Sequence, residues 1–123
     1  MYKFIRLDAD NIGDKIELEL LLGNTSKAQE IHNSVQAALH SIREKLVQKI
    51  GVEILMYGSD DILLRFNLKH YDLNIIEEIR HLFYQLTSFT LSVGIGDTLQ
   101  QALIGLTQAK LSGKNQIVEY TLE

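Results

Sequence analysis

Along most of the chain, hydrophobic residues either alternate with polar ones or recur at helical spacing. Residues 2–8 combine aromatic and aliphatic side chains with two basic ones, which is typical of a β-strand. Residues 10–22 are expected to form a loop or a short helix, and a break follows at 23–25. Ser26 and Gln29 are predicted to start a long helix as a capping box. The apolar residues of this helix are spaced along one face, which Gly51 is expected to end: Ile31, Val35, Leu39, Ile42, Leu46 and Ile50.

The rest of the chain continues to alternate between strands and helices. Residues 52–57 and 62–67 are rich in β-forming side chains and flank the segment 58–61, so they predict a hairpin with an acidic tip. The remaining expected elements are a helix capped by Asp72, a strand at 89–95, a helix capped by Thr98 and Gln101 and ended by Gly113, and a strand at 115–121. The order β-α-β-β-α-β-α-β indicates an α/β (α+β) fold of the ferredoxin-like, split βαβ type, with a mixed and mainly antiparallel sheet.

Length and composition narrow the class of protein. The 123 residues fit one domain spanning 1–123, and no internal repeat or linker interrupts them. Hydrophobic residues at 46% and charged residues at 23% are close to globular averages, which favours a folded domain over a disordered one. Twelve basic residues against sixteen acidic ones give a net charge of −4, which argues against a broad basic surface for long nucleic acid.

Two further absences from the sequence bear on chemistry and location. The chain has no cysteine, so disulfides, thiolate metal sites and cysteine nucleophiles are excluded. The N-terminal segment becomes charged at Arg6 and Asp8, too early for the apolar part of a signal peptide. No apolar run approaches the ~20 residues that a membrane span needs. We therefore expect a cytoplasmic protein without membrane insertion.

Four carboxylates are the first candidates for chemistry. In a split βαβ sheet the end of the first strand lies beside the central hairpin, so Asp8 and Asp10 are expected to face Asp60 and Asp61. Carboxylates that meet repel one another unless cations offset their charge, and oxygen ligands suit Mg²⁺ or Mn²⁺. Such a metal takes further ligands from substrate phosphates, and two metals can hold the attacking and leaving oxygens of a phosphoryl transfer. The sequence therefore predicts a divalent metal site.

Two lysines near the end of the last helix extend this hypothesis. Lys110 and Lys114 supply point charges that can hold phosphate oxygens, so a nucleoside triphosphate is the expected substrate. Each feature also has an ordinary structural interpretation. Asp10 can cap a helix, Asp60 and Asp61 are common turn residues, and cations complement a helix C-terminus. Residues 8–19 also imitate a calcium loop, but the match is weak.

Four motifs together resemble the GGDEF/CRISPR-polymerase palm superfamily. They are Asp8-Ala9-Asp10-Asn11-Ile12-Gly13, Gly58-Ser59-Asp60-Asp61, Ser92-Val93-Gly94-Ile95 and the ending from Ala109-Lys110 to Gly113-Lys114-Asn115. The resemblance covers nearly the whole chain and fits best the stand-alone minimal CRISPR polymerase family, related to the palms of type III CRISPR cyclic oligoadenylate synthases and to diguanylate cyclases. Gly13 stands where diguanylate cyclases usually carry lysine, and Ser59 replaces a second hairpin glycine, which weakens a cyclic di-GMP assignment.

The resemblance implies roles for individual residues. Asp8 and Asp60 would bind metal with the Ala9 carbonyl, and Asp61 would act as a ligand or as the activator of the attacking hydroxyl. Asp60 and Asp61 are thus the expected catalytic pair. The expected nucleotide-binding residues are Asp10, Asn11, Ile12, Gly13, Gly58, Ser59, Lys110 and Lys114.

The function implied is a Mg²⁺- or Mn²⁺-dependent nucleotide cyclase acting in anti-phage signalling. It would join nucleoside triphosphates, with ATP favoured by the resemblance, into a cyclic di- or oligonucleotide with release of pyrophosphate. Because one small palm holds one triphosphate, ring closure calls for two sites facing each other, most simply in a C2 homodimer. A downstream effector would respond to the product. The alternatives are an inactive palm that binds a nucleotide and regulates a partner, and a ferredoxin-like adaptor between proteins.

Overall fold

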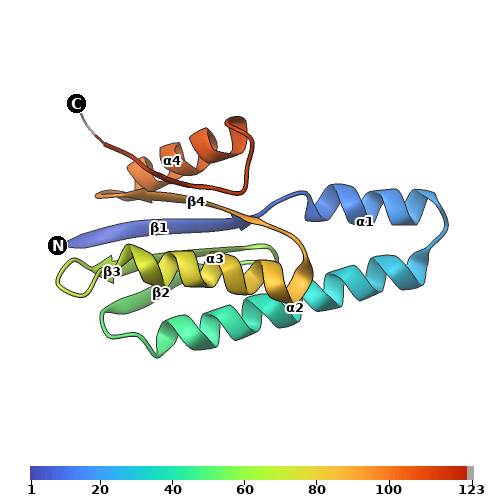
Figure 1. The fold of residues 1–123 in the computed structure, drawn as a ribbon, viewed down its shortest axis with the longest axis horizontal. Coiled ribbons are helices and arrows are strands. Elements are labelled where there is room, and N and C mark those ends of the chain that lie inside the picture. The colour runs from blue at the N-terminus through green and yellow to red at the C-terminus, as the bar shows by residue number, and fades with distance from the viewer. Residues whose placement is uncertain (122–123) are drawn as a thin grey trace.

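A five-stranded sheet in the order β2-β3-β1-β4-β5 forms the centre of the computed structural model, which describes residues 1–121 (Figure 1). The strands are β1 Tyr2–Ala9, β2 Val52–Tyr57, β3 Asp61–Asn67, β4 Leu91–Gly96 and β5 Ile117–Glu119. The helices are α1 Ile12–Leu21, α2 Thr25–Val47, α3 Leu73–Thr87 and α4 Leu99–Leu111. Strand β1 is antiparallel to both β3 and β4, and only the β4–β5 pair is parallel. The predicted split βαβ arrangement is confirmed.

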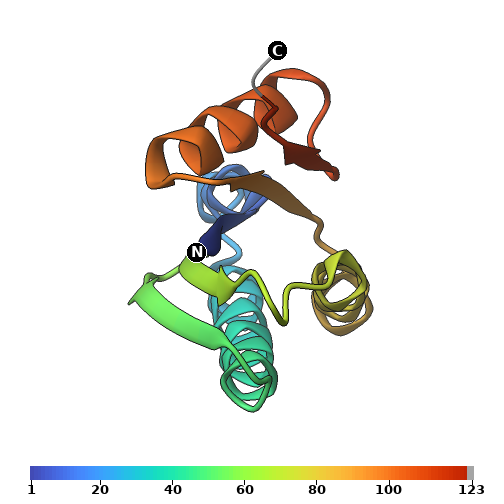
Figure 2. The same cartoon turned by 90° about the vertical axis from the view of Figure 1, so that its left-hand side faces the viewer.

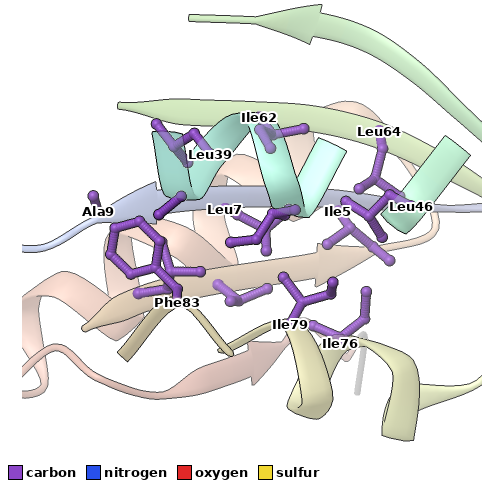
Figure 3. Packing of buried hydrophobic residues seen from close by; sticks show 14 of the residues in the cluster. Ile5, Leu7, Ala9, Leu39, Leu46, Ile62, Leu64, Ile76, Ile79 and Phe83 are labelled. Carbon is purple, nitrogen blue, oxygen red and sulfur yellow. The ribbon is translucent and has the colours of Figure 1, made fainter. Parts of the chain in front are cut away.

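The core lies between the sheet and helices α2 and α3. On β1 the inward side chains alternate along the strand, as Ile5, Leu7 and Ala9 are buried while their neighbours are less so. They meet Leu39 and Leu46 of α2, among other apolar side chains (Figure 3). Burying one such leucine or isoleucine contributes about 1.5–3 kcal/mol. This packing fixes β1, whose C-terminal end carries Asp8.

Helix α4 covers the other side of the sheet, over β4 and β5 (Figure 2). It packs close to the sheet because both α4 and β4 carry glycine at their contact. A Cβ added to Gly94 of β4 would lie 2.1 Å from the Ala102 carbonyl oxygen, and one on Gly105 would lie 2.7 Å from the Val118 carbonyl oxygen. The close approach brings Lys110, in the last turn of α4, to the C-terminal end of β1.

The segment 10–22, expected as a loop or a short helix, contains helix α1. It leaves the end of β1 and runs beyond the sheet beside the N-terminal half of α2 (Figure 1). No helix in residues 1–121 combines the length and the apolar character needed to cross a membrane.

The predicted limits of α2 were wrong at both ends. The helix begins at Thr25 with Asn24 as N-cap, so Ser26 lies inside it and forms no capping box. The Asn24 side chain donates instead to Glu19 of α1, at 3.0 Å. The helix ends at Val47, and Ile50 is 74% exposed, because the chain reverses through Gly51, at φ +87°, to enter β2.

The other caps follow the prediction. The Asp72 carboxylate accepts from the Asn74 N–H at 2.9 Å, and the Thr98 hydroxyl accepts from the Gln101 N–H at 3.2 Å. Strand β5 is shorter than the expected 115–121, because residues 113–115 form a left-handed turn before it.

Candidate active site

The C-terminal end of β1 lies beside the tip of the β2–β3 hairpin, as predicted. Asp8 stands opposite Asp61 in the β1–β3 ladder, and the Ala9 N–H donates to the Asp60 carbonyl oxygen at 2.9 Å. Burial raises the pKa of the Asp8 carboxyl above its usual value, and the nearby charges of Asp60 and Asp61 raise it further against the lowering effect of Lys110. The residues Asp8, Asp60 and Asp61 therefore lie near one another at the C-terminal end of β1.

Asp61 is held by Arg6, which the sequence analysis did not single out. The Arg6 guanidinium pairs with the Asp61 carboxylate, and both side chains are about three-quarters buried. The signal was present in the spacing, because Arg6 and Asp8 lie two residues apart and share one face of β1. A Cβ on Gly58 would lie 2.1 Å from the Asp61 carboxylate, so this turn position favours glycine.

The other tip residues are open to solvent. Ser59 and Asp60 are exposed, and the Ser59 carbonyl accepts from the Gln36 side chain of α2. The Gly58 N–H donates to the Asp61 carbonyl at 3.0 Å and closes the turn. The tip therefore presents the Asp60 carboxylate to solvent while Asp61 is fixed by the sheet.

Asp10 does not join the other three carboxylates, so that expectation was wrong for this residue. It lies beyond the last β1–β3 pair and leans toward β4, where its fully buried carboxylate accepts from the hydroxyls of Thr90 and Ser92, both at 2.7 Å. It also accepts from the Asn115 N–H at 3.0 Å and pairs with Lys110. Asp10 is not the cap of α1 either, because Asn11 occupies that position. Its side chain has no exposed surface, although the residue is among those that line a cavity beside Asn11.

These partners decide the charge of Asp10. Burial by itself would raise the pKa of the Asp10 carboxyl, but the hydrogen bonds from Lys110, Thr90, Ser92 and the Asn115 N–H outweigh it and lower the pKa. Asp10 is therefore a buried anion that joins β1, β4 and α4. The hydroxyls of Thr90 and Ser92 were missed as a set, although their two-residue spacing on one strand face is visible in the sequence.

Lys110 occupies the centre of the site. Its Nζ lies 2.7 Å from Asp10 Oδ1, 3.1 Å from Asp8 Oδ1 and 3.2 Å from the Ala9 carbonyl oxygen. Burial would lower the pKa of this ammonium, but the hydrogen bonds to Asp10 and Asp8 raise it above its usual value. Lys110 is therefore charged and bound to the site oxygens in the free protein.

Lys114 lies on the turn that follows α4. Gly113, Lys114 and Asn115 all have positive φ, at +112°, +65° and +51°. The Lys114 ammonium donates to the Asn11 side-chain oxygen at 2.5 Å, and Asn11 is itself left-handed at φ +62°. Arg80 of α3 holds Asn115 by its carbonyl and side-chain oxygens, at 3.1 and 2.7 Å. The surrounding contacts thus hold a strained backbone in place, a feature that clusters at functional sites.

The phosphate-loop candidates lie at the start of α1. Asn11 and Gly13 are exposed and Ile12 is buried. A Cβ on Gly13 would meet no atom within 4 Å. A cavity of about 410 Å³ opens beside Asn11, lined by Lys15 on α1 and Phe89 after α3. Its size is ordinary for a small-molecule site.

The donor atoms fit a divalent cation, although no cluster stands ready. Within residues 1–121, no three His, Cys, Asp or Glu side chains are grouped closely enough to hold a metal. The Asp8 carboxylate and the Ala9 carbonyl nevertheless point to one position. The Lys110 ammonium occupies that position, as a metal cation would. Both donors are hard oxygens of the kind that Mg²⁺ prefers, and Asp60 and Asp61 lie next to them.

Comparison with known proteins gives one family. The model of the minimal CRISPR polymerase domain matches residues 4–120. No curated protein matches the sequence.

Solved structures share the fold at low sequence identity. The Csm1-Csm4 cassette in complex with cA4 matches with a TM-score of 0.71 and 16% identity, over 94% of this chain and 20% of that one. The same cassette with one ATP matches with a TM-score of 0.67 and 16% identity over the same shares. The diguanylate cyclase SiaD of Pseudomonas aeruginosa, in complex with its activator SiaC, matches with a TM-score of 0.66 and 18% identity, over 96% of this chain and 49% of that one. The chain thus spans a fifth to a half of these proteins.

Proposed function

This chain belongs to the minimal CRISPR polymerase domain family, and we propose that it is a metal-dependent nucleotide cyclase. It would join nucleoside triphosphates, ATP foremost, into a cyclic di- or oligonucleotide. The observation that carries the proposal is the convergence of the Asp8 carboxylate, the Ala9 carbonyl and the Lys110 ammonium at the end of β1, beside Asp60 and Asp61. The fold shared with a cassette solved with ATP or cA4, and with a diguanylate cyclase, supports the same class.

The residues that would hold the metal are Asp8, the Ala9 carbonyl, Asp60 and Asp61. Bound Mg²⁺ or Mn²⁺ would supply charge stabilisation for the phosphoryl transfer. Asp61 would serve as ligand or hydroxyl activator, and its pair with Arg6 fixes the carboxylate on the sheet before any substrate arrives. Preorganised charge of this kind lowers a barrier because little rearrangement is needed in the reaction.

The phosphate groups would lie between the start of α1 and the end of α4. The backbone at Asn11 and Ile12 would contact them, with Lys110 and Lys114 as the cations. Lys114 is already tied to Asn11. Asp10 would take a different part from the one expected: its buried carboxylate would position Lys110 and Asn115.

Each transfer would join two nucleotides. The hydroxyl of one nucleotide would attack the α-phosphate of another and give up its proton, for which Asp61 is the candidate acceptor. A new P–O bond would form, and pyrophosphate would leave with the electrons of the broken P–O bond. A second attack closes the ring. Two facing sites in a C2 homodimer would hold the two triphosphates, and the product would act on a downstream effector in anti-phage defence.

A second function is favoured by two observations. Lys110 takes the position of a cation among the site oxygens, and the described residues show no ready metal cluster. An inactive palm that binds a nucleotide and regulates a partner would show both features. Turnover separates the two functions.

The test is pyrophosphate release from each of the four nucleoside triphosphates with Mg²⁺ or Mn²⁺. The cyclase predicts release by the wild type and loss in a variant carrying Asp60→Ala and Asp61→Ala. Glu44→Ala is the matched control, since Glu44 is exposed on α2 away from the site. Nucleotide binding without pyrophosphate release under any of these conditions supports the inactive palm.

A further inference from the structure

We propose that Lys110 is a displaceable cation: it fills the metal position of the free protein and yields it when a polyphosphate binds. Binding of the divalent cation and of the nucleotide is then coupled through one side chain. The inference rests on the proposed function for the identity of the ligands. It goes beyond that function in assigning how the site is switched.

Three oxygens define the position that Lys110 fills. Asp8 Oδ1, Asp10 Oδ1 and the Ala9 carbonyl oxygen lie 3.1, 2.7 and 3.2 Å from its Nζ. Two of the three, from Asp8 and Ala9, are proposed metal ligands. A divalent cation that shares these oxygens with the ammonium would sit against a like charge, which disfavours binding of both. The metal alone therefore binds weakly while Lys110 stays in place.

The local contacts allow Lys110 to leave. Its side chain is 26% exposed, so it has a path to solvent. The buried Asp10 carboxylate would retain the hydroxyls of Thr90 and Ser92 and the Asn115 N–H after the ammonium moves. The buried anion then keeps three hydrogen bonds but loses its counter-ion, which carries a cost. These three hydrogen bonds offset part of the cost of moving the ammonium, and its new contacts with the phosphates must offset the rest.

A polyphosphate gives the ammonium a new partner. Lys114 and Asn11 mark the nearby surface where phosphates are proposed to bind. An ammonium that turns to them frees the Asp8 and Ala9 oxygens for the metal, so each ligand favours the binding of the other. Coupling between two ligands is reciprocal, and typical values change affinity by about 5- to 150-fold.

The experiment measures Mn²⁺ affinity without turnover, by calorimetry and by the electron paramagnetic resonance signal of free Mn²⁺. In the absence of nucleotide, Lys110→Met should bind Mn²⁺ about tenfold or more tightly than the wild type. Lys114→Met is the matched control, because it removes a nearby charge that does not contact Asp8 or Ala9, and it should change the affinity much less. Once the Mn²⁺ bound by the free analogue is subtracted, a non-hydrolysable ATP analogue should tighten Mn²⁺ binding to the wild type about tenfold and to Lys110→Met little.

Equal or weaker Mn²⁺ binding by Lys110→Met would overturn the inference, as would equal tightening by Lys114→Met, which would indicate a general charge effect. Lys110→Gln gives the same comparison if the methionine variant unfolds. The Mn²⁺ measurement does not depend on catalysis. Tighter binding by Lys110→Met without pyrophosphate release from any triphosphate would sustain the displaceable cation and reject the cyclase. Pyrophosphate release by the wild type, together with an unchanged Mn²⁺ affinity in Lys110→Met, would sustain the cyclase and reject the displaceable cation.

Discussion

The ammonium of Lys110 lies 2.7 Å from the carboxylate of Asp10, a residue 100 positions earlier in the chain. The pair joins the first strand to the last turn of α4, and its anion is fully buried. A buried pair of this kind holds two distant segments in register. It also places the lysine between the sheet and the solvent, within reach of Asp8.

Asp10→Asn should destabilise the fold. The amide keeps the size of the side chain but removes the charge that Lys110, Thr90, Ser92 and the Asn115 N–H contact. Loss of one partner of a buried charge pair costs about 3–5 kcal/mol. Urea unfolding should show a loss in this range, whereas Asp14→Asn, at an exposed position on α1, should cost less than about 1 kcal/mol. A loss no larger than that of the control would contradict the role given to Asp10.

The same variant predicts a pH dependence in the metal-free protein. The folded state lowers the pKa of Asp10, so its contribution to the free energy of unfolding is fully present above the unfolded pKa of about 3.9. The contribution is lost as the pH falls through the lower folded value. The stability difference between the wild type and Asp10→Asn should be constant from about pH 5 to 7 and shrink in acid. A difference that grows as the pH falls would refute this.

Gly94→Ala should displace α4. The new Cβ would lie 2.1 Å from the Ala102 carbonyl oxygen and 2.2 Å from the Leu106 nitrogen, and neither backbone atom can yield alone. Overpacking costs typically about 1–3 kcal/mol, and a backbone clash places this variant at the upper end or beyond. Gly13→Ala, where a Cβ meets nothing within 4 Å, should be neutral or stabilising by up to about 1 kcal/mol. Thermal unfolding compares the two, and equal stability would show that α4 does not need the close approach.

Arg6→Met should impair catalysis in the folded protein. It removes the partner that fixes Asp61 next to Asp8. Loss of a residue that orients a metal ligand typically costs about 10–100-fold in activity or metal affinity. Arg65→Met is the control, because its pair with Glu53 lies farther along the hairpin at the surface. Steady-state pyrophosphate release should fall for the first variant only. A similar fall for both variants would contradict the role of Arg6 in positioning Asp61.

The sequence predicted those parts of the site that depend on strand order. Once the order β-α-β-β is recognised, the end of β1 must lie beside the hairpin, which brings Asp8 to Asp61. The caps at Asp72 and Thr98 were also predictable, because each depends on one side chain and an N–H two or three residues later.

Features decided by distant contacts were not predictable in the same way. Nothing local shows that Asp10 leans toward the hydroxyls of Thr90 and Ser92, because these residues lie 80 and 82 positions later in the chain. The limits of α2 changed for a related reason. Asn24 is held by Glu19 of α1, and the helical spacing that includes Ile50 gives way where the chain must reverse into β2. In these cases contacts or turns outside the helix outweighed a valid local rule.

The central claim, that this palm makes a cyclic nucleotide, is tested most directly by mass spectrometry of the product from ATP with Mg²⁺ or Mn²⁺. A cyclic product releases one pyrophosphate for each nucleotide incorporated and retains no triphosphate. We predict such a species for the wild type and for Glu44→Ala, and none for the variant with both Asp60→Ala and Asp61→Ala. A linear product that keeps its triphosphate, cleavage of ATP to ADP alone, or product formation by the double variant would contradict the account.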